Sequence, residues 1–181
     1  MAYFTAVLTP DGDGWRSVDV DLEAGSPEEL GDVLRGAVGD DAVVLAVLER
    51  EDEWFALVRT DGDDTRVFVS DAVAAADSSY AELFAELPPA TQVPAPGAGD
   101  ADGGGGDAGT VPEGADAAPA AAVAAPAVAE AVWAGDPDLL ADLGCPPAVL
   151  VRLALAGTDP SAATVEVGEL LGFADVLESL R

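Results

Sequence analysis

The stretch from Ala42 to Thr60, AVVLAVLEREDEWFALVRT, constrains the fold of this 181-residue chain more than any other segment. Its first seven residues are all apolar and rich in Val, which is typical of a strand that is covered on both faces. A charged connection from Glu49 to Glu53 follows, and Trp54 to Val58 then returns as a second apolar run. The pattern predicts a hairpin at the centre of a sheet.

Three more strands are predicted on either side of this hairpin. Tyr3 to Leu8 alternates with period two, and a turn at Pro10 to Gly14 leads into the alternating residues Val18 to Leu22. These two strands should therefore pair with each other. After the turn at Asp61 to Asp64, Thr65 to Ser70 alternates again and is the fifth expected strand.

Helix signals separate and follow these strands. Ser26-Pro27-Glu28-Glu29 has the form of a capping box with proline at the first helical position, and an apolar stripe from Leu30 to Val38 leads to Gly39 as the helix end. Asp71 to Ala76 predicts a short helical piece, and Ser79 with Glu82 suggests a second capping box for a helix reaching Leu87. Residues 1–87 are thus expected to form an α+β domain in the order ββαβββα, with a mostly antiparallel sheet of about five strands and packed helices.

The composition changes after this domain. Residues 88–126 are dominated by Pro, Gly and Ala and predict a long disordered linker. Residues 127–181 regain helical pattern and predict a small C-terminal helical bundle, although short helices of this kind depend on packing for stability. The sequence leaves open whether this bundle touches the sheet. The expected helical segments are Pro137 to Leu143, Pro147 to Ala156, Pro160 to Leu171 and a final stripe from Phe173 to Leu180.

The charge of the chain is strongly one-sided. Seven arginines face 35 acidic residues, His and Lys are absent, and the formal net charge is −28. Residues 1–87 carry 21 of the acids against 5 arginines, so the acidity is not confined to a tail. Such a surface repels phosphate groups and anionic lipid, and it predicts no direct binding to nucleic acid or membranes. The charge instead fits a basic partner or none, and a role in solubility alone is favoured over a role in attracting a partner.

The residue inventory excludes several chemistries. Without His the chain cannot build Ser-His-Asp or Cys-His nucleophile systems, and without Lys it has no Walker A loop or Schiff-base lysine. The acidic turns that begin at Asp11 and Asp61 resemble calcium loops only superficially, because Arg16 and Arg66 stand where glycine is needed. We therefore assign no catalytic, cofactor-binding or metal-binding residue, and we expect no cofactor and no enzymatic activity.

Four side chains are candidates for a catalytic or binding role, but each also has a structural role as an alternative. Cys145 has no visible base beside it and is expected to be a small core or loop residue rather than a nucleophile. Trp15 and Trp54 are expected to pack on the sheet, whereas Trp133 would either anchor a partner or dock the helical segment. A single cysteine, the absence of a signal-peptide pattern and the absence of a spanning apolar run together predict a cytoplasmic protein.

Several motifs in combination resemble a known family. They are MAYFTAVL at the start, a Gly-Trp after an acidic turn, EDEWFALVR, RVFVSDA, and LLGFADVLESLR near the end. The set is similar to the tRNA adenosine deaminase-associated protein family of high-GC Gram-positive bacteria, over residues 1–87 and about 136–181. The resemblance implies a connection to the deaminase and brings no catalytic residues with it. Zinc deaminases need a His or Cys and a P-C-x-x-C element, which this chain lacks.

The sequence therefore favours a non-catalytic acidic accessory or adaptor protein, with tRNA adenosine deaminase as the partner that the resemblance implies. The alternative is a carboxylate-based metal-binding or ligand-binding domain, or a hydrolase that uses carboxylates. A third reading is a self-associating module that uses the apolar C-terminal helices. Oligomeric state and strand order are left open.

Overall fold

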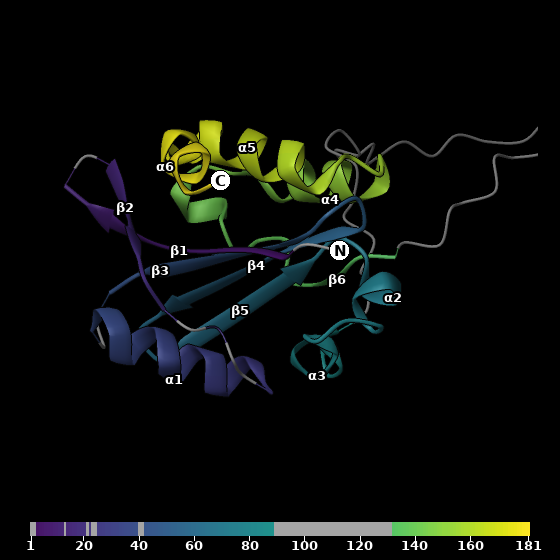
Figure 1. The fold of residues 1–181 in the computed structure, drawn as a ribbon, viewed down its shortest axis with the longest axis horizontal. Helices are drawn as coiled ribbons and strands as arrows, with labels where there is room; N and C mark the ends of the chain where they lie inside the picture. The colour runs from purple at the N-terminus through teal and green to yellow at the C-terminus, as the bar shows by residue number, and fades with distance from the viewer. Residues whose placement is uncertain (1–2, 13, 21, 23–24, 40–41, 89–131) are drawn as a thin grey trace, which may run out of the picture. The chain divides into compact units, whose positions relative to one another are not determined.

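The computed structural model describes residues 3–12, 14–20, 22, 25–39, 42–88 and 132–181. Six strands form one sheet in the order β2-β1-β3-β4-β5-β6, and every neighbouring pair is antiparallel (Figure 1). The predicted α+β class and antiparallel sheet are confirmed, with one strand more than expected. The strands are β1 (Tyr3–Asp11), β2 (Gly14–Val18), β3 (Val44–Arg50), β4 (Trp54–Asp61), β5 (Asp64–Val69) and β6 (Ala134–Gly135).

Helices cover both faces of this sheet. In Figure 1, the first three helices lie on one side of the strands and the last three on the other. The first group is α1 (Pro27–Val38), α2 (Ala72–Ala75) and α3 (Ala81–Phe84). The second group is α4 (Pro147–Leu155), α5 (Pro160–Leu171) and α6 (Ala174–Leu180), preceded by a 3₁₀ turn, η1 (Ala141–Leu143).

The predicted hairpin at the centre of the sheet is present. β3 and β4 pair from Val44 opposite Thr60 to Arg50 opposite Trp54, and they occupy the middle of the strand order. Every residue of the two strands is buried except the last one of each. Strands that bury alternate residues on both faces need an uninterrupted apolar sequence, and this requirement explains the run from Ala42 to Leu48.

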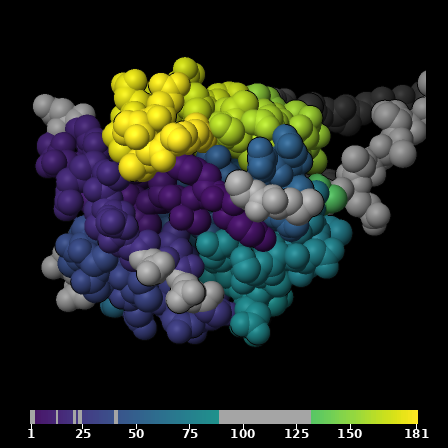
Figure 2. Space-filling model, viewed as in Figure 1, coloured from purple at the N-terminus to yellow at the C-terminus, as the bar shows by residue number. Residues whose placement is uncertain are grey.

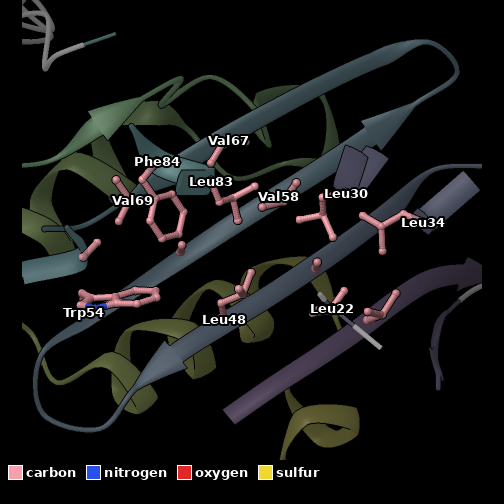
Figure 3. Packing of buried hydrophobic residues seen from close by; sticks show 14 of the residues in the cluster. Leu22, Leu30, Leu34, Leu48, Trp54, Val58, Val67, Val69, Leu83 and Phe84 are labelled. Atoms are coloured by element: carbon pink, nitrogen blue, oxygen red, sulfur yellow. The ribbon is translucent and has the colours of Figure 1, made fainter. Parts of the chain in front are cut away.

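One face of the sheet packs against α1, α2 and α3. Ser26 accepts a hydrogen bond from the Glu29 amide at 3.1 Å, and Glu29 in turn accepts one from the Gly25 amide at 2.9 Å, so the first capping signal is confirmed. Leu30 and Leu34 then enter the core beside Leu48 and Val58 (Figure 3). The helix stripe and the alternate strand residues thus bury the same apolar surface.

The opposite face is covered by the C-terminal helices. The alternate strand residues Leu45, Leu57 and Phe68 are completely buried, as are Leu150 and Val167 from the helices. α5 contacts β3 and β4, α6 contacts β2, and β6 extends the sheet next to β5. The described residues up to 88 and from 132 onward belong to one compact unit. The question of contact that the sequence left open is therefore answered: the helices pack on the sheet.

The second strand differs from its predicted position. It spans Gly14–Val18 rather than Val18 to Leu22, because the turn at Gly12, with a φ of 61°, is tight enough for pairing to start at Gly14 opposite Asp11. Leu22 is nevertheless buried in the core on the α1 side. The alternation of apolar and polar residues after Val18 therefore reflects the burial of Leu22 and not pairing in a strand.

Two helix predictions are also corrected. Pro137 to Leu143 forms a turn followed by η1 rather than an α-helix, and Gly144 in the left-handed conformation ends it. The capping box predicted at Ser79 and Glu82 is wrong, because α3 starts after Tyr80 with no side-chain cap. Instead, the Ser78 hydroxyl accepts a hydrogen bond from the Tyr80 amide at 3.2 Å.

The segment predicted as a linker, 88–126, lies outside the described residues except for Pro88. The final helices α4, α5 and α6 agree with the predicted helical segments to within one or two residues. Within the described ranges, no helix is both long enough and apolar enough to cross a membrane.

Candidate partner-binding groove

Two neighbouring hollows lie where the β3–β4 turn meets the start of α5. Their volumes are about 360 and about 450 Å³, and both are lined by Asp52, Asp159 and Pro160. We call them together the acidic groove. Its acidic lining residues are Glu49, Glu51, Asp52, Glu53, Asp71 and Asp159, and its basic lining residue is Arg181.

The β3–β4 turn supplies three of these carboxylates on a rigid support. Asp52 has a φ of 61°, the left-handed conformation that Asp and Asn tolerate better than most residues. The Glu53 amide donates to the Arg50 carbonyl at 3.1 Å, and the Arg50 guanidinium lies 2.9 Å from the Glu53 carboxylate. The side chains of Glu51 and Asp52 are exposed at the tip of this turn. They are therefore available to a partner.

Two more carboxylates in the groove also serve as helix caps. Asp159 accepts a hydrogen bond from the Ala162 amide at 3.0 Å and caps α5. Asp71 accepts from the amides of Val73 and Ala74 at 3.0 and 2.9 Å and caps α2. The caps fix the direction of both carboxylates, and substituting either residue would also weaken its helix.

The inner wall of the groove is a small polar network around Glu49. This carboxylate is only 5% exposed, and it accepts hydrogen bonds from the Thr164 hydroxyl and, at 2.6 Å, from the Arg181 guanidinium. Arg181 also lies over the Phe4 ring, 4.9 Å from its centroid. The network joins β3 to α5 and to Arg181, and it neutralises the Glu49 carboxylate, which is the buried one among the described acidic side chains.

A second polar network joins the sheet to the segment before α4. Arg59 is 4% exposed and donates to the Leu139 carbonyl at 2.8 Å, to both carboxylate oxygens of Asp142, and to Asp61 at 2.8 Å. These hydrogen bonds from the guanidinium hold the pKa of Asp142 below its ordinary value. The same contacts raise the pKa of Arg59, so both groups stay charged at neutral pH.

This network makes stability depend on pH in one direction. A carboxyl whose pKa is lower in the folded protein stabilises the fold above its unfolded pKa of about 4, and the contribution disappears as the pH falls through the folded pKa. Asp142→Asn should therefore lower the free energy of unfolding. The loss should be constant between about pH 5 and pH 7 and should become smaller below about pH 4. Urea unfolding of both proteins across this range measures it. A difference that grows in acid would contradict the assignment.

The tryptophans singled out in the sequence all pack in the fold. Trp133 is 2% exposed and stacks on Phe68 with ring centroids 5.7 Å apart, so it docks its own segment onto the sheet. The Trp15 indole donates to the Leu171 carbonyl at 2.8 Å, which ties β2 to the end of α5. Trp54 is completely buried against Phe84. Trp15 and Trp54 behave as expected, and the structure favours docking for Trp133.

The remaining candidates show no assembled chemistry. Cys145 is completely buried, and burial raises the pKa of its thiol. The two acidic turns close the β1–β2 and β4–β5 hairpins, with Gly12 and Gly62 at positive φ. Within the described part of the chain, no group of three or more Cys, Asp or Glu side chains is arranged to hold a metal ion.

Sequence reasoning did not find the acidic groove. The carboxylates that line it come from the end of β3 and the turn after it, from the start of α2 and from the start of α5, and these segments are separated by up to about a hundred residues. Glu49 and Arg59 carried a local signal, since both are charged residues next to long apolar runs. A charged residue inside a buried strand needs a partner, but the sequence does not say which one.

The fold and this surface define a small α+β protein in which one antiparallel sheet is covered on both faces and bears an acidic groove at one end. A family model for Rv3753c-like tRNA adenosine deaminase-associated proteins matches residues 3–174, and the chain belongs to that family. The resemblance noted in the sequence is thereby confirmed. No curated protein and no solved structure matches the chain.

Proposed function

We propose that this protein is a non-catalytic accessory protein that binds a tRNA adenosine deaminase through the acidic groove. The observation that supports it is the composition of the groove, whose described lining has six acidic side chains and one arginine that is already bound to Glu49. The family description supplies the partner. Without His or Lys and with one buried cysteine, the chain lacks the side chains from which a zinc deaminase site is built.

The physical basis of binding is charge complementarity. An enzyme that binds tRNA needs basic side chains on its substrate face to neutralise phosphates. The net charge of −28 would attract such a face over long range, and the groove would then accept individual basic side chains. The accessory protein would act in the cytoplasm, where a chain with a single cysteine needs no disulfide.

The test compares two double variants that remove the same charge at different places. Glu51→Gln with Asp52→Asn neutralises the tip of the β3–β4 turn, and asparagine keeps the positive φ at position 52. Asp63→Asn with Asp64→Asn neutralises the exposed β4–β5 turn. Affinity for the deaminase of the same organism, measured by isothermal titration calorimetry at about 50 mM salt, should fall about tenfold for the first variant and little for the second.

Salt provides the second readout. The complex should weaken as the salt concentration rises, because the attraction between charged surfaces is screened. The absence of a complex at low salt would refute the proposed function. If both double variants lost affinity equally, binding would depend on the net charge of the protein and not on the groove.

A further inference from the structure

Half of β1 has a free edge. β1 pairs with β3 from Tyr3 to Leu8, but it pairs with β2 only from Val7 to Asp11. After Val18 the chain leaves the sheet. The stretch from Tyr3 to Ala6 therefore has β3 on one edge and, among the residues that the structure describes, no strand on the other.

The backbone groups on that free edge belong to Tyr3 and Thr5. A two-residue hairpin closes on a hydrogen-bonded pair, here Asp11 and Gly14, so Asp11, Thr9 and Val7 direct their amide and carbonyl groups toward β2. Successive residues of a strand point these groups to opposite edges, so every second residue of β1 points them to the same edge. The amide and carbonyl groups of Thr5 and Tyr3 therefore point toward the free edge.

The free edge has no charged residue, no proline and no bulge to block strand addition. Exposed edges are commonly protected by lysine, proline, an inward charge or a bulge. The sequence from Tyr3 to Ala6 is Tyr-Phe-Thr-Ala, which has no charge and no proline and contains good strand formers. Its pairing with β3 runs in continuous register without a bulge. The edge is thus ready to pair.

A hollow of about 370 Å³ lies beside this edge, in the fork where β2 departs from β1. Figure 2 shows the purple surface of the N-terminal strands facing the viewer below the yellow surface of α6. Among the lining residues that the structure describes, Asp19 is the one with a charged side chain, and the others offer mainly apolar surface. The lining residues are Thr5, Ala6, Val7, Ser17, Val18, Asp19, Val20, Leu22 and Leu180.

Two occupants from the protein itself fit this edge poorly. The described residues that follow β2 line the hollow beside the edge but do not pair with β1, and Leu22 among them is 7% exposed and packs in the core on the α1 side. A second copy would bring another net charge of −28 to the interface, and such repulsion opposes pairing. An extended segment with basic side chains meets neither obstacle.

We infer that the free edge of β1 accepts an extended segment of a partner protein, with alternating apolar and basic side chains, as a seventh strand of the sheet. The backbone of Tyr3 and Thr5 would supply the hydrogen bonds, the hollow would take the apolar side chains, and the charge of the chain would select basic ones. This inference does not depend on the proposed function, because it concerns the backbone edge of β1 rather than the carboxylates of the acidic groove and is tested without the deaminase. Tyr3 and Phe4 lie at both surfaces.

Hydrogen exchange of the full-length protein tests the first requirement. The Thr5 amide should exchange at a nearly unprotected rate, while the Ala6 amide, which faces β3, and the Val7 amide, which faces β2, should exchange at least about a hundredfold more slowly. If the Thr5 amide is protected in the free protein, something already covers the edge and the inference is wrong.

Synthetic peptides of about seven residues test the occupant. A peptide alternating valine and lysine should bind, protect the Thr5 amide from exchange, and bind at least about tenfold more tightly than one alternating valine and glutamate. The valine-lysine peptide with a central proline should bind at least about tenfold more weakly, because proline cannot complete the ladder. No binding of the first peptide, or equal binding of the proline peptide, would overturn the inference.

Two substitutions of Thr5 distinguish the contribution of its backbone amide to peptide binding from that of its side chain. Thr5→Pro removes the amide hydrogen on the free edge, where proline is tolerated, and should weaken peptide binding about tenfold. Thr5→Val keeps the amide and should bind normally, and thermal unfolding of both variants checks that each is folded. Sedimentation tests whether a second copy of the protein occupies the edge instead. If the protein is a dimer and Thr5→Pro dissociates it, the edge binds a second copy and the inference is refuted.

Discussion

Gly135→Ala should lower the free energy of unfolding by about 3 kcal/mol or more. Gly135 in β6 has a φ of 95°, and an added Cβ atom would lie 2.0 Å from the Val67 carbonyl oxygen and 2.9 Å from its carbonyl carbon. These are backbone atoms of β5, so no side-chain rotation can relieve the clash. The substitution should push β6 away from the sheet, together with Trp133 on Phe68.

A glycine with open space at the position of an added Cβ atom provides the matched control for this variant. Gly12 also has a positive φ of 61°, but a Cβ atom there would meet nothing within 4 Å. Gly12→Ala should therefore cost about 1 kcal/mol, which is the conformational term alone. Urea unfolding of the two variants measures the difference. Equal losses would mean that β6 does not approach β5 as closely as the structure shows.

Arg59→Met should lower the free energy of unfolding by about 2 to 3 kcal/mol. Methionine retains much of the buried apolar stem, but it removes the donors that satisfy the Leu139 carbonyl and bind Asp142 and Asp61. The loss should be smaller than for a fully buried ion pair, because the side chains of Asp142 and Asp61 are 56% and 52% exposed and stay partly hydrated.

The cross-strand partner of Arg59 is its control. Arg66 stands directly opposite on β5, has a side chain that is 41% exposed, and lies 3.8 Å from Asp64. Arg66→Met should therefore change stability by less than about 0.5 kcal/mol. Chemical unfolding at neutral pH compares the two arginines. A similar effect at both positions would show that the buried hydrogen bonds of Arg59 contribute nothing beyond the charge that both arginines place near Asp142.

Local signals in the sequence were sufficient for most of the secondary structure. The apolar runs on either side of Glu49 to Glu53 predicted the central hairpin, because a strand buried on both faces has no polar alternative. Ser26 and Pro27 predicted the start of α1, and Asp159 with Pro160 predicted α5, since capping depends on a few adjacent residues. The family assignment also followed from the sequence.

Other features were decided by contacts between distant residues. A two-residue strand such as β6 has no periodicity to detect, and it forms because Val67 and Pro88 bind the backbone around Gly135. The segment after Pro137 was expected to be helical, but its Leu139 carbonyl is taken by Arg59. Both outcomes depend on partners far away in the chain.

The sequence by itself determined the class of the fold, the central hairpin, the main helices and the excess of negative charge, because each depends on neighbouring residues or on composition. The tertiary structure alone decided that the C-terminal helices cover the second face of the sheet and that carboxylates from three distant segments meet in one groove. It also decided that β2 leaves β1 early, since burial of Leu22 outweighs continued pairing at this edge. Packing of distant elements sets all three features, and no local pattern encodes it.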